Sequence, residues 1–362
     1  MRTYSAILVS GGAGFIGSNF IRYLLGPESG FQGLVVNVDA LSYAGNLDNL
    51  SDLAAGLGGT RYFFERANIC DRAAVENIVA RYHIDAVCHL AAESHVDRSI
   101  LGPEAFVRTN VLGTFTLLDV VRQAWRGLDG VWFHQVSTDE VYGTLGPTGS
   151  FSEASPYAPR SPYSASKAAA DHLVMAYHHS YGLPVSVSNC GNNYGPRQFP
   201  EKLVPLMILN MLEGKSLPVY GDGRQVRDWL YVDDHVRAVW AIMRGGSPGH
   251  SYAVGGGNEL ENLGLVERLA DIVAEETGAD AERYRGLITL VPDRPGHDRR
   301  YALDTGKIRR ELGWEPRMEF DRGLRETVRW YMDNPAWIER VRSGEYRRWL
   351  DSNYGWRQGG KA

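Results

Sequence analysis

A short segment near the middle of the chain combines a hydroxyl, two adjacent carboxylates, a phenol and an ammonium group. Thr138, Asp139 and Glu140 directly follow a run of strand-forming residues. Tyr163 and Lys167 come one loop later and are four residues apart, so on a helix their side chains share one face. An ammonium beside a phenol favours the phenolate and lowers a pKa that is ordinarily about 10. These five residues predict proton-transfer chemistry on a carbon skeleton.

Each part of this segment also has a purely structural interpretation. Thr138–Glu140 could form an exposed acidic turn, and a tyrosine four residues before a lysine occurs by chance in many helices. The catalytic interpretation is favoured because a dinucleotide-binding motif precedes the segment in the same chain. In addition, Pro162 just before Tyr163 is typical of a helix start.

The dinucleotide motif lies at the N-terminus. A strand is expected over residues 5–10, and glycines at positions 11, 14 and 17 follow it, with apolar residues at helical spacing beyond them. Such glycines allow a tight turn and close approach to a pyrophosphate, which the helix N-terminus then faces. Asp39 ends the next expected strand, 22 residues beyond Gly17. A carboxylate there binds both ribose hydroxyls and repels a 2′-phosphate, so we predict NAD rather than NADP; the alternative is a glycine turn with a surface aspartate.

Strand and helix patterns alternate along the chain and predict an α/β fold with a Rossmann-type doubly wound parallel sheet. After residue 188 glycine, proline and asparagine become frequent, which marks the passage into a smaller α/β C-terminal substrate-binding domain. A helix over 233–243 and a strand over 251–254 are expected to return to the first sheet. We therefore expect a cofactor-binding domain from residues 1–188 and 228–258, and a substrate-binding domain from residues 189–227 and 259–362.

Composition limits the possible partners. The 362 residues carry a net charge of −5, whereas proteins that bind nucleic acid are generally basic. No apolar run approaches the roughly 18 residues that a membrane-spanning helix needs. The three cysteines, Cys70, Cys88 and Cys190, do not form an even set, and no cysteine–histidine spacing indicates a metal site. We expect a cytoplasmic protein with no nucleic-acid or membrane partner and no metal.

Two long helical stretches, residues 110–125 and 163–181, carry apolar residues on most of their faces. A helix that is apolar nearly all round is either buried or part of an interface. We expect the two helices to pack across a two-fold axis in a homodimer. Burial inside one subunit is the alternative.

Several motifs together resemble those of the dTDP-glucose 4,6-dehydratases, a family of the extended short-chain dehydrogenase/reductase superfamily. They are Gly11–Gly17, His89–Ser99, Ser137–Gly143, Tyr163 with Lys167, and Asn192–Pro196. The resemblance continues through Asp293–Asp298 to Asn353 and Tyr354. The triplet Thr138–Asp139–Glu140 distinguishes it from the epimerases of the superfamily, which keep the tyrosine and lysine but lack the paired acid and base.

The resemblance implies loss of water from dTDP-glucose to give dTDP-4-keto-6-deoxyglucose, in deoxysugar biosynthesis for rhamnose or for a secondary metabolite. Tyr163, held as phenolate by Lys167, would take the proton of the sugar 4-hydroxyl, which Thr138 also binds, while C4 gives hydride to NAD. The new ketone would acidify the C5 proton. Glu140 would then act as base at C5 and Asp139 as acid at the departing 6-hydroxyl. Hydride would return to C6, so the cofactor is regenerated and stays bound.

The resemblance also implies two sets of binding residues. Those for the cofactor are Gly11, Gly14, Phe15, Ile16, Gly17, Asp39, Ser42, Asn68, Ile69, Leu90, Ala91, Ala92, Thr109, Tyr163, Lys167 and Cys190. Those for the nucleotide sugar are Ser94, Thr138, Asn192, Asn193, Glu201, Lys202, Leu203, Pro218, Tyr220, Arg227, Asn262, Arg294, His297 and Tyr354. Within the second set, Pro218 and Tyr220 are expected near the base and most of the others around the diphosphate.

Three features depart from the family pattern. Ala40 stands where members often have a lysine after the ribose-binding aspartate, and Asn68 where they often have an aspartate near the adenine. Both positions lie at the adenosine end, so they bear on cofactor affinity rather than on the chemistry. The loop between Gly143 and Tyr163 is short beside many relatives, which bears on how the site closes.

Three other interpretations of the same residues stay open. A dehydratase for another nucleotide sugar, such as UDP-glucose or GDP-mannose, would share the chemistry, although GDP-mannose enzymes usually prefer NADP, which Asp39 disfavours. A 4-epimerase would have no use for Asp139 and Glu140. A protein that binds or senses NAD without catalysis would require every catalytic residue to be present by coincidence.

Overall fold

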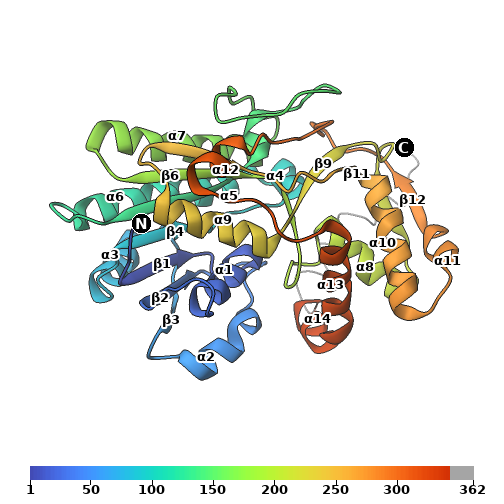
Figure 1. The fold of residues 1–362 in the computed structure, drawn as a ribbon, viewed down its shortest axis with the longest axis horizontal. Coiled ribbons are helices and arrows are strands. Elements are labelled where there is room, and N and C mark those ends of the chain that lie inside the picture. Colours follow the sequence, from blue (N-terminus) through green and yellow to red (C-terminus); the bar gives the residue numbers. More distant parts are fainter. Residues whose placement is uncertain (343–362) are drawn as a thin grey trace.

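Seven parallel strands form the central sheet of the computed structural model, which describes residues 1–342 (Figure 1). Their order is β10-β6-β5-β4-β1-β2-β3. The strands are β1 (Ala6–Ser10), β2 (Leu34–Asp39), β3 (Tyr62–Arg66), β4 (Ala86–His89), β5 (Trp132–Thr138), β6 (Val185–Cys190) and β10 (His250–Val254). The order reverses between β1 and β4, where sheets of this kind bind ligands at the carboxyl ends of the strands. The predicted doubly wound sheet is confirmed.

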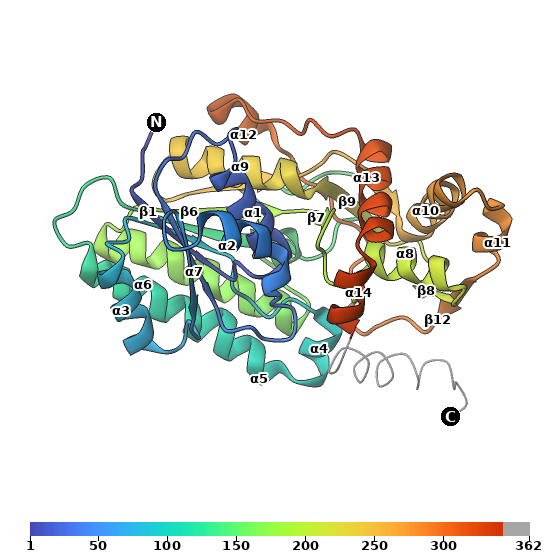
Figure 2. The same ribbon diagram turned by 90° about the horizontal axis from the view of Figure 1, so that it is seen from below.

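Two layers of helices cover the sheet because alternate strand residues point to opposite faces. Ile7 and Val9 of β1 pack in one core with α1 (Phe15–Leu25) and α9 (Val232–Gly245). Leu8, between them, packs in the core on the other face. The helices of that second layer are α3 (Arg72–Arg81), α6 (Thr114–Ala124) and α7 (Pro162–Tyr181). Figure 2 shows the strands between these two layers.

After β6 the chain builds a smaller α/β part, which lies to the right in Figure 1. It contains a three-stranded sheet, β11-β9-β7, and a two-stranded sheet, β12-β8. Trp229, Leu265 and Leu324 lie in its separate hydrophobic core. The elements of this part are β7 (Asn192–Tyr194), α8 (Leu203–Glu213), β8 (Leu217–Tyr220), β9 (Val226–Tyr231), β11 (Glu259–Glu261), α10 (Asn262–Thr277), α11 (Ala281–Arg285), β12 (Ile288–Val291), α13 (Phe320–Asp333) and α14 (Pro335–Arg342).

The chain crosses between the two parts at residues that differ in detail from the domain limits predicted from the sequence. β6 continues to Cys190, past the expected limit at residue 188. α12 (Gly306–Leu312) follows the smaller part in sequence, yet it packs on β10 and α9, with Ile308 in the core they share. The segment around α12 therefore covers the main sheet. The division into two domains at the stated residues stays a prediction.

Short helical segments connect strands to helices beside the site. They are η1 (Leu47–Leu50), α2 (Ser51–Leu57), α4 (Val96–Leu101), α5 (Pro103–Phe106), the π-helical η2 (Val107–Gly113) and the 3₁₀ turn η3 (Asp139–Tyr142). The helix expected over 110–125 is thus formed by the end of η2 and by α6. The sequence also predicts a helix over 337–350; in the structure it begins earlier, as α14, and the predicted part beyond residue 342 lies outside the described residues. Among residues 1–342, no helix is long and apolar enough to cross a lipid bilayer.

Candidate active site

Two adjoining cavities open at the carboxyl ends of the central strands. The larger has a volume of about 410 Å³ and reaches from the glycine-rich turn after β1 to the first turns of α7. The smaller, of about 160 Å³, lies between α4 and the strands of the smaller part. Both are lined by Ser94, Glu140, Asn192, Glu201 and Lys202. A ligand can therefore extend from one cavity into the other.

The glycine-rich turn shapes one end of the larger cavity. Gly11 has a φ of +72°, and a Cβ on it would lie 2.7 Å from the Ala91 backbone. A Cβ on Gly17 would lie 2.2 Å from the Gly11 carbonyl oxygen, so neither position tolerates a side chain. Gly14 is the N-cap of α1, and no side chain caps the first N–H groups of that helix. The turn thus offers free N–H groups and a positive helix end to a pyrophosphate.

Asp39 is buried at the carboxyl end of β2, next to this turn. Its Oδ2 accepts a hydrogen bond from the Ala13 N–H at 3.0 Å, and its Oδ1 accepts one from the Leu41 N–H at 2.8 Å. Burial raises the pKa of this carboxyl, and the two N–H groups oppose the rise. The carboxyl group is therefore fixed in the wall of the cavity, where a dinucleotide would place a ribose.

Every residue predicted to bind the cofactor lines the larger cavity. The wall also contains Glu93, which lies in the motif His89–Ser99 but was not assigned to either set of binding residues. Asn110 of η2 holds the Glu93 main chain with two hydrogen bonds of 2.8 and 3.0 Å and donates a third, of 2.8 Å, to Ser166 of α7. The signal in the sequence for this role of Asn110 was a polar side chain within a helical stretch that is apolar on most of its faces. Its contacts, however, come from elements remote in the sequence.

Thr138 ends β5 and Asp139 begins η3, so a hydroxyl and two carboxyls enter the larger cavity together. Thr138 Oγ1 accepts from the Glu140 N–H at 3.2 Å and donates to Asp139 Oδ1 at 3.3 Å. The Asp139 residue is only 2% exposed. Its burial, and after that the charge of Glu140, raises the pKa of Asp139 well above the usual range. The surroundings of Asp139 therefore favour its protonated form.

Glu140 lies where the two cavities meet and faces three cations. Burial raises the pKa of this carboxyl, but Arg294, Arg227 and Lys202 all lower it. Asp139 has weaker compensation, because Arg227 alone among these cations opposes the rise of its pKa. Neighbouring carboxyls in such different surroundings take different protonation states, which is the arrangement of an acid beside a base.

Tyr163 and Lys167 enter the same cavity from the first two turns of α7. Ser161 caps this helix: its hydroxyl accepts from the Ser164 N–H at 3.1 Å, and the Ser164 hydroxyl accepts from the Ser161 N–H at 3.0 Å. Lys167 Nζ donates to the Val136 carbonyl oxygen at 2.8 Å. This capping and the contact with β5 fix both side chains relative to the sheet.

The predicted lowering of the Tyr163 pKa by Lys167 is wrong for the site as it stands. Burial raises the pKa of the phenol well above 10, and the charge of Glu140 raises it further. The ammonium of Lys167 donates to a main-chain carbonyl, and burial lowers the pKa of Lys167 itself. Desolvation disfavours the charged form of both groups. A phenolate at Tyr163 therefore requires additional positive charge in the cavity.

A buried carboxyl behind this pair, Asp171, was not identified from the sequence. It lies four residues after Lys167 in α7, and it accepts hydrogen bonds from Ser137 Oγ at 2.5 Å and from the Tyr157 hydroxyl at 3.0 Å. Its charge opposes the effect of burial on Lys167 and so favours the ammonium form. Helical spacing from Lys167 was the available signal, but the strand and loop partners follow only from the fold.

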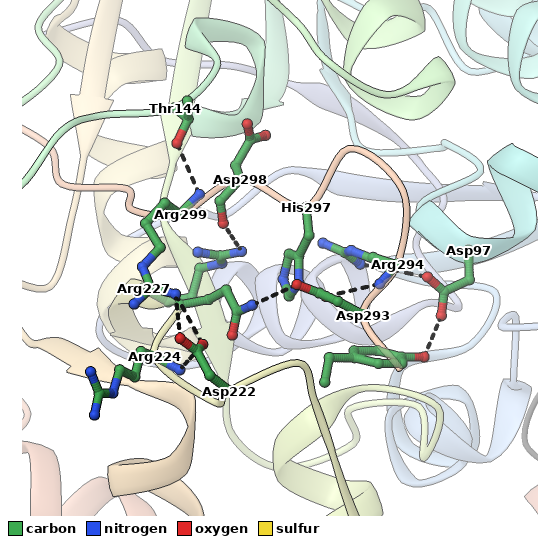
Figure 3. A network of polar contacts seen from close by, with 12 residues as sticks. Asp97, Thr144, Asp222, Arg224, Arg227, Asp293, Arg294, His297, Asp298 and Arg299 are labelled. Atoms are coloured by element: carbon green, nitrogen blue, oxygen red, sulfur yellow. Dashed lines mark hydrogen bonds and ion pairs between the residues drawn. The ribbon is translucent and has the colours of Figure 1, made fainter. Parts of the chain in front are cut away.

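The residues predicted to bind the nucleotide sugar all line one of the two cavities, as far as the structure describes them. Tyr354, also predicted, lies outside the described residues. Arg227 donates to the Asp298 carbonyl oxygen at 3.0 Å (Figure 3), and Lys202 donates to the Ser94 carbonyl oxygen at 2.8 Å. These bonds fix two cations in the wall of the smaller cavity. Within residues 1–342, no group of three or more His, Cys, Asp or Glu side chains could hold a metal ion.

The doubly wound sheet, the glycine turn before α1 and the tyrosine–lysine pair at the cavity define an extended short-chain dehydrogenase/reductase with a second, substrate-binding part. The family model of GDP-mannose 4,6 dehydratase matches residues 8–327. The dTDP-glucose 4,6-dehydratase of Salmonella typhimurium is 52% identical over 366 residues, which cover 97% of this chain and 99% of the relative. That of Neisseria meningitidis is 53% identical over 350 residues, which cover 94% and 97%.

Solved structures agree with these relatives. The dTDP-glucose 4,6-dehydratase of Streptomyces venezuelae, crystallised with NAD and TYD bound, superposes with a TM-score of 0.85 at 46% identity and covers 93% of this chain and 99% of its own. The UDP-glucose 4-epimerase of Thermotoga maritima gives a TM-score of 0.79 at 32% identity, with coverages of 91% and 99%. The chain belongs to the dTDP-glucose 4,6-dehydratase family, as its motifs predicted.

Proposed function

We propose that this chain converts dTDP-glucose to dTDP-4-keto-6-deoxyglucose and water, with NAD as a tightly bound cofactor. One observation carries the proposal: Asp139 and Glu140, two carboxyls in different electrostatic surroundings, share a cavity with Tyr163 and a dinucleotide cradle. An epimerase needs the tyrosine and the cofactor. Loss of water needs an acid and a base in addition.

The larger cavity fits NAD. Gly11 and Gly17 exclude the side chains that would fill the pyrophosphate position, and the Asp39 carboxyl suits a ribose with two free hydroxyls. When bound, oxidised NAD accepts a hydride from the sugar and later returns it, and its positively charged ring favours a phenolate at Tyr163. The Streptomyces venezuelae relative, which has NAD bound, supports this assignment.

Tyr163 takes the proton of the 4-hydroxyl as C4 is oxidised to a ketone. Lys167, one helical turn further along α7, holds its ammonium group on the Val136 carbonyl beside this site. Asp171 in turn supports the charge of Lys167. Thr138, at the end of β5, holds the same sugar oxygen.

The ketone at C4 acidifies the proton at C5. Glu140, which three cations favour in its ionised form, removes that proton. Asp139, which burial keeps protonated, gives its proton to the C6 hydroxyl, and the C6–oxygen bond breaks to release water. A C5–C6 double bond results, with Glu140 now protonated and Asp139 ionised. Hydride addition at C6 and return of the Glu140 proton to C5 complete the product. The proton that Tyr163 took from the 4-hydroxyl balances the one that Asp139 gave to the water, so its transfer to Asp139 through the solvent restores both groups.

The smaller cavity takes the nucleoside diphosphate. Lys202, Arg227 and Arg294 place three cations in its wall, and guanidinium groups form paired bonds with phosphate oxygens. Pro218 and Tyr220 offer flat apolar surfaces to the base. The Streptomyces venezuelae relative, a dTDP-glucose 4,6-dehydratase with TYD bound, supports dTDP-glucose as the substrate.

We also propose that the protein is a homodimer. Four exposed apolar residues lie on consecutive helices from α4 to α6: Leu101 (74% exposed), Val107 (57%), Leu112 (45%) and Phe115 (38%). These helices pack beside α7, the other predicted interface helix. A second copy related by a two-fold axis would cover this face. Light scattering should give a dimer for the wild type and a monomer for Phe115→Glu; a wild-type monomer at micromolar concentration would contradict the proposal.

We place the reaction in the cytoplasm. Cys70, Cys88 and Cys190 are all free thiols in the described structure, and two of them are buried. Buried unpaired thiols suit a reducing compartment. Fractionation of cells that produce the protein should recover it with cytoplasmic markers, and recovery with extracytoplasmic markers would contradict this placement.

The purified protein, without added reductant, should be mixed separately with dTDP-glucose, UDP-glucose and GDP-mannose. Loss of water from dTDP-glucose alone, measured by mass and NMR, is the expected outcome. In deuterium oxide the product should carry solvent deuterium at C5, because Glu140 exchanges its proton before returning it. Loss of water from another nucleotide sugar instead would contradict dTDP-glucose as the substrate while keeping the reaction. Absence of any product from NAD-loaded protein would overturn the proposed function.

A further inference from the structure

We propose that Asp97 is a positioning residue of the smaller cavity. From the first turn of α4 it holds Tyr220 and Arg294, two wall residues from the other part of the molecule, in the orientation that receives the nucleoside diphosphate. This inference rests on the proposed function, and it adds a residue to which neither the motifs nor the chemistry gives a role.

The contacts of the Asp97 carboxylate join the two parts of the molecule. Tyr220, at the end of β8, donates its hydroxyl to Asp97 Oδ2 at 2.7 Å. Arg294, in the loop after β12, has its Nη1 atom 3.7 Å from Asp97 Oδ1. Figure 3 shows the guanidinium of Arg294 facing this carboxylate. Asp97 and Tyr220 are 123 residues apart in the sequence, so the contact joins two distant segments that both line the smaller cavity.

Burial makes these contacts energetically relevant. The Asp97 side chain is 4% exposed and that of Arg294 is 17% exposed, so solvent screens their attraction only weakly. The neighbouring His95 does not compete as a cation, because burial lowers its pKa well below the usual range. A charge-assisted hydrogen bond and a guanidinium on one carboxylate restrict the rotamers of both wall residues before the ligand arrives.

The position of Arg294 explains why such a restraint is useful. This guanidinium acts on Asp97 and also, through its charge, on the catalytic base Glu140. Asp97 keeps it on the nucleotide side when no diphosphate is present. Once the diphosphate is bound, its oxygens hold Arg294 instead. Loss of Asp97 should therefore weaken ligand binding far more than it lowers the turnover rate of the bound substrate.

Two variants separate the two contacts. Asp97→Asn removes the charge that attracts Arg294 and keeps an oxygen that can accept from Tyr220, whereas Asp97→Ala removes both. The matched control is Asp222→Asn, an exposed aspartate 2.9 Å from Arg299 beside the same loop (Figure 3). It makes the same change of charge outside the cavity.

Calorimetric titration of the NAD-loaded variants with dTDP and with thymidine is the experiment. Asp97→Asn should weaken dTDP binding roughly tenfold and leave thymidine binding nearly unchanged. Asp97→Ala should weaken dTDP binding roughly a hundredfold and thymidine binding as well. The KM for dTDP-glucose should rise in proportion while kcat stays within roughly threefold of the wild type. Asp222→Asn should match the wild type in every measurement.

Wild-type affinity for dTDP in both Asp97 variants would overturn the inference. A parallel loss of NAD content, Tm and dTDP affinity would also overturn it, because that pattern indicates general destabilisation. Tyr220→Phe is a second variant that removes a single hydroxyl and needs no change at Asp97. If both residues act through the hydrogen bond between them, the double variant should lose less dTDP affinity than the sum of the losses in Tyr220→Phe and Asp97→Ala. Wild-type turnover tests the proposed function and dTDP binding tests Asp97, so the two can fail separately.

Discussion

Replacing Asp139 by asparagine keeps the volume of the side chain and removes the proton that the departing hydroxyl needs. Asp139 is 2% exposed, and burial raises its pKa well above the usual range, so the fold favours the neutral form of the native group. The amide therefore adds neither a buried charge nor a cavity. The Tm of Asp139→Asn should be close to that of the wild type, and any loss of activity then reports on chemistry.

The expected loss follows from the role of the proton. An asparagine amide can occupy the place beside Thr138 Oγ1, which is 3.3 Å from Asp139 Oδ1, but it cannot transfer a proton to the sugar. General acid catalysis contributes about 10²–10⁴-fold, which corresponds to roughly 3–5 kcal/mol of the barrier. Dehydration should slow by that factor. Oxidation at C4, which uses Tyr163, should keep its wild-type rate.

A single-turnover experiment with NAD-loaded protein and dTDP-glucose separates the two steps. In the wild type the absorbance of NADH should rise and fall, whereas in Asp139→Asn it should rise at the wild-type rate and persist. Glu140→Gln is the matched control, because it should stall at the same stage by a different route. In deuterium oxide the intermediate in Asp139→Asn should exchange its C5 proton, and that in Glu140→Gln should not. Wild-type dehydration by Asp139→Asn, or loss of NADH formation together with dehydration, would refute the assignment.

Three further predictions concern other parts of the site. Tyr163→Phe should abolish NADH formation in the same single-turnover assay, because no group then accepts the 4-hydroxyl proton; an undiminished NADH signal would exclude Tyr163 from the mechanism. Burial raises the pKa of Glu201 from 4.5 to about 7, so the folded protein favours the neutral carboxyl. Below pH 4.5 the carboxyl is neutral in both the folded and the unfolded state, and the folded protein has its full stability. As the pH rises through 7 the buried carboxyl must ionise, and the free energy of unfolding decreases. Glu201→Gln should therefore match the wild type below pH 4.5 and exceed its stability by roughly 3 kcal/mol above pH 7. A series of Tm values against pH measures this, and a pH-independent difference would contradict it. Gly17→Ala places a Cβ 2.2 Å from the Gly11 carbonyl oxygen, so protein purified with this change should release little NAD on denaturation, and a full complement of NAD would contradict the cradle.

Local patterns were sufficient to predict the main elements. The strands and helices that carry the glycine turn, Asp39 and Tyr163 lie within a few residues of their predicted places, because hydrophobic periodicity and capping residues are local properties. The doubly wound topology also followed, since alternating strands and helices admit few other arrangements. The family was predicted correctly from motifs that together extend over most of the chain. The individual roles of the site residues stay predictions until the variants are measured.

The structure changed the electrostatic interpretation of the site. Spacing on one helix face predicted a lowered pKa for Tyr163, but burial reverses the direction and Lys167 is bonded to the Val136 carbonyl. Spacing carries no information on how much water reaches a group. Desolvation depends on every element that packs around it, and in this site those elements come from both parts of the chain.

The sequence by itself determined the fold class, the dinucleotide turn and the presence of an acid, a base and a tyrosine in one short segment. The family resemblance implied that Asp139 is the acid and Glu140 the base, and the tertiary structure adds a physical reason for that assignment. Asp139 is buried, while Glu140 faces Lys202, Arg227 and Arg294, which three separate segments supply. Tertiary structure likewise placed Asp97 against Tyr220 and Arg294. Protonation state and orientation are set by burial and by charges that lie close in space, and neither can be read from residues that are distant in sequence.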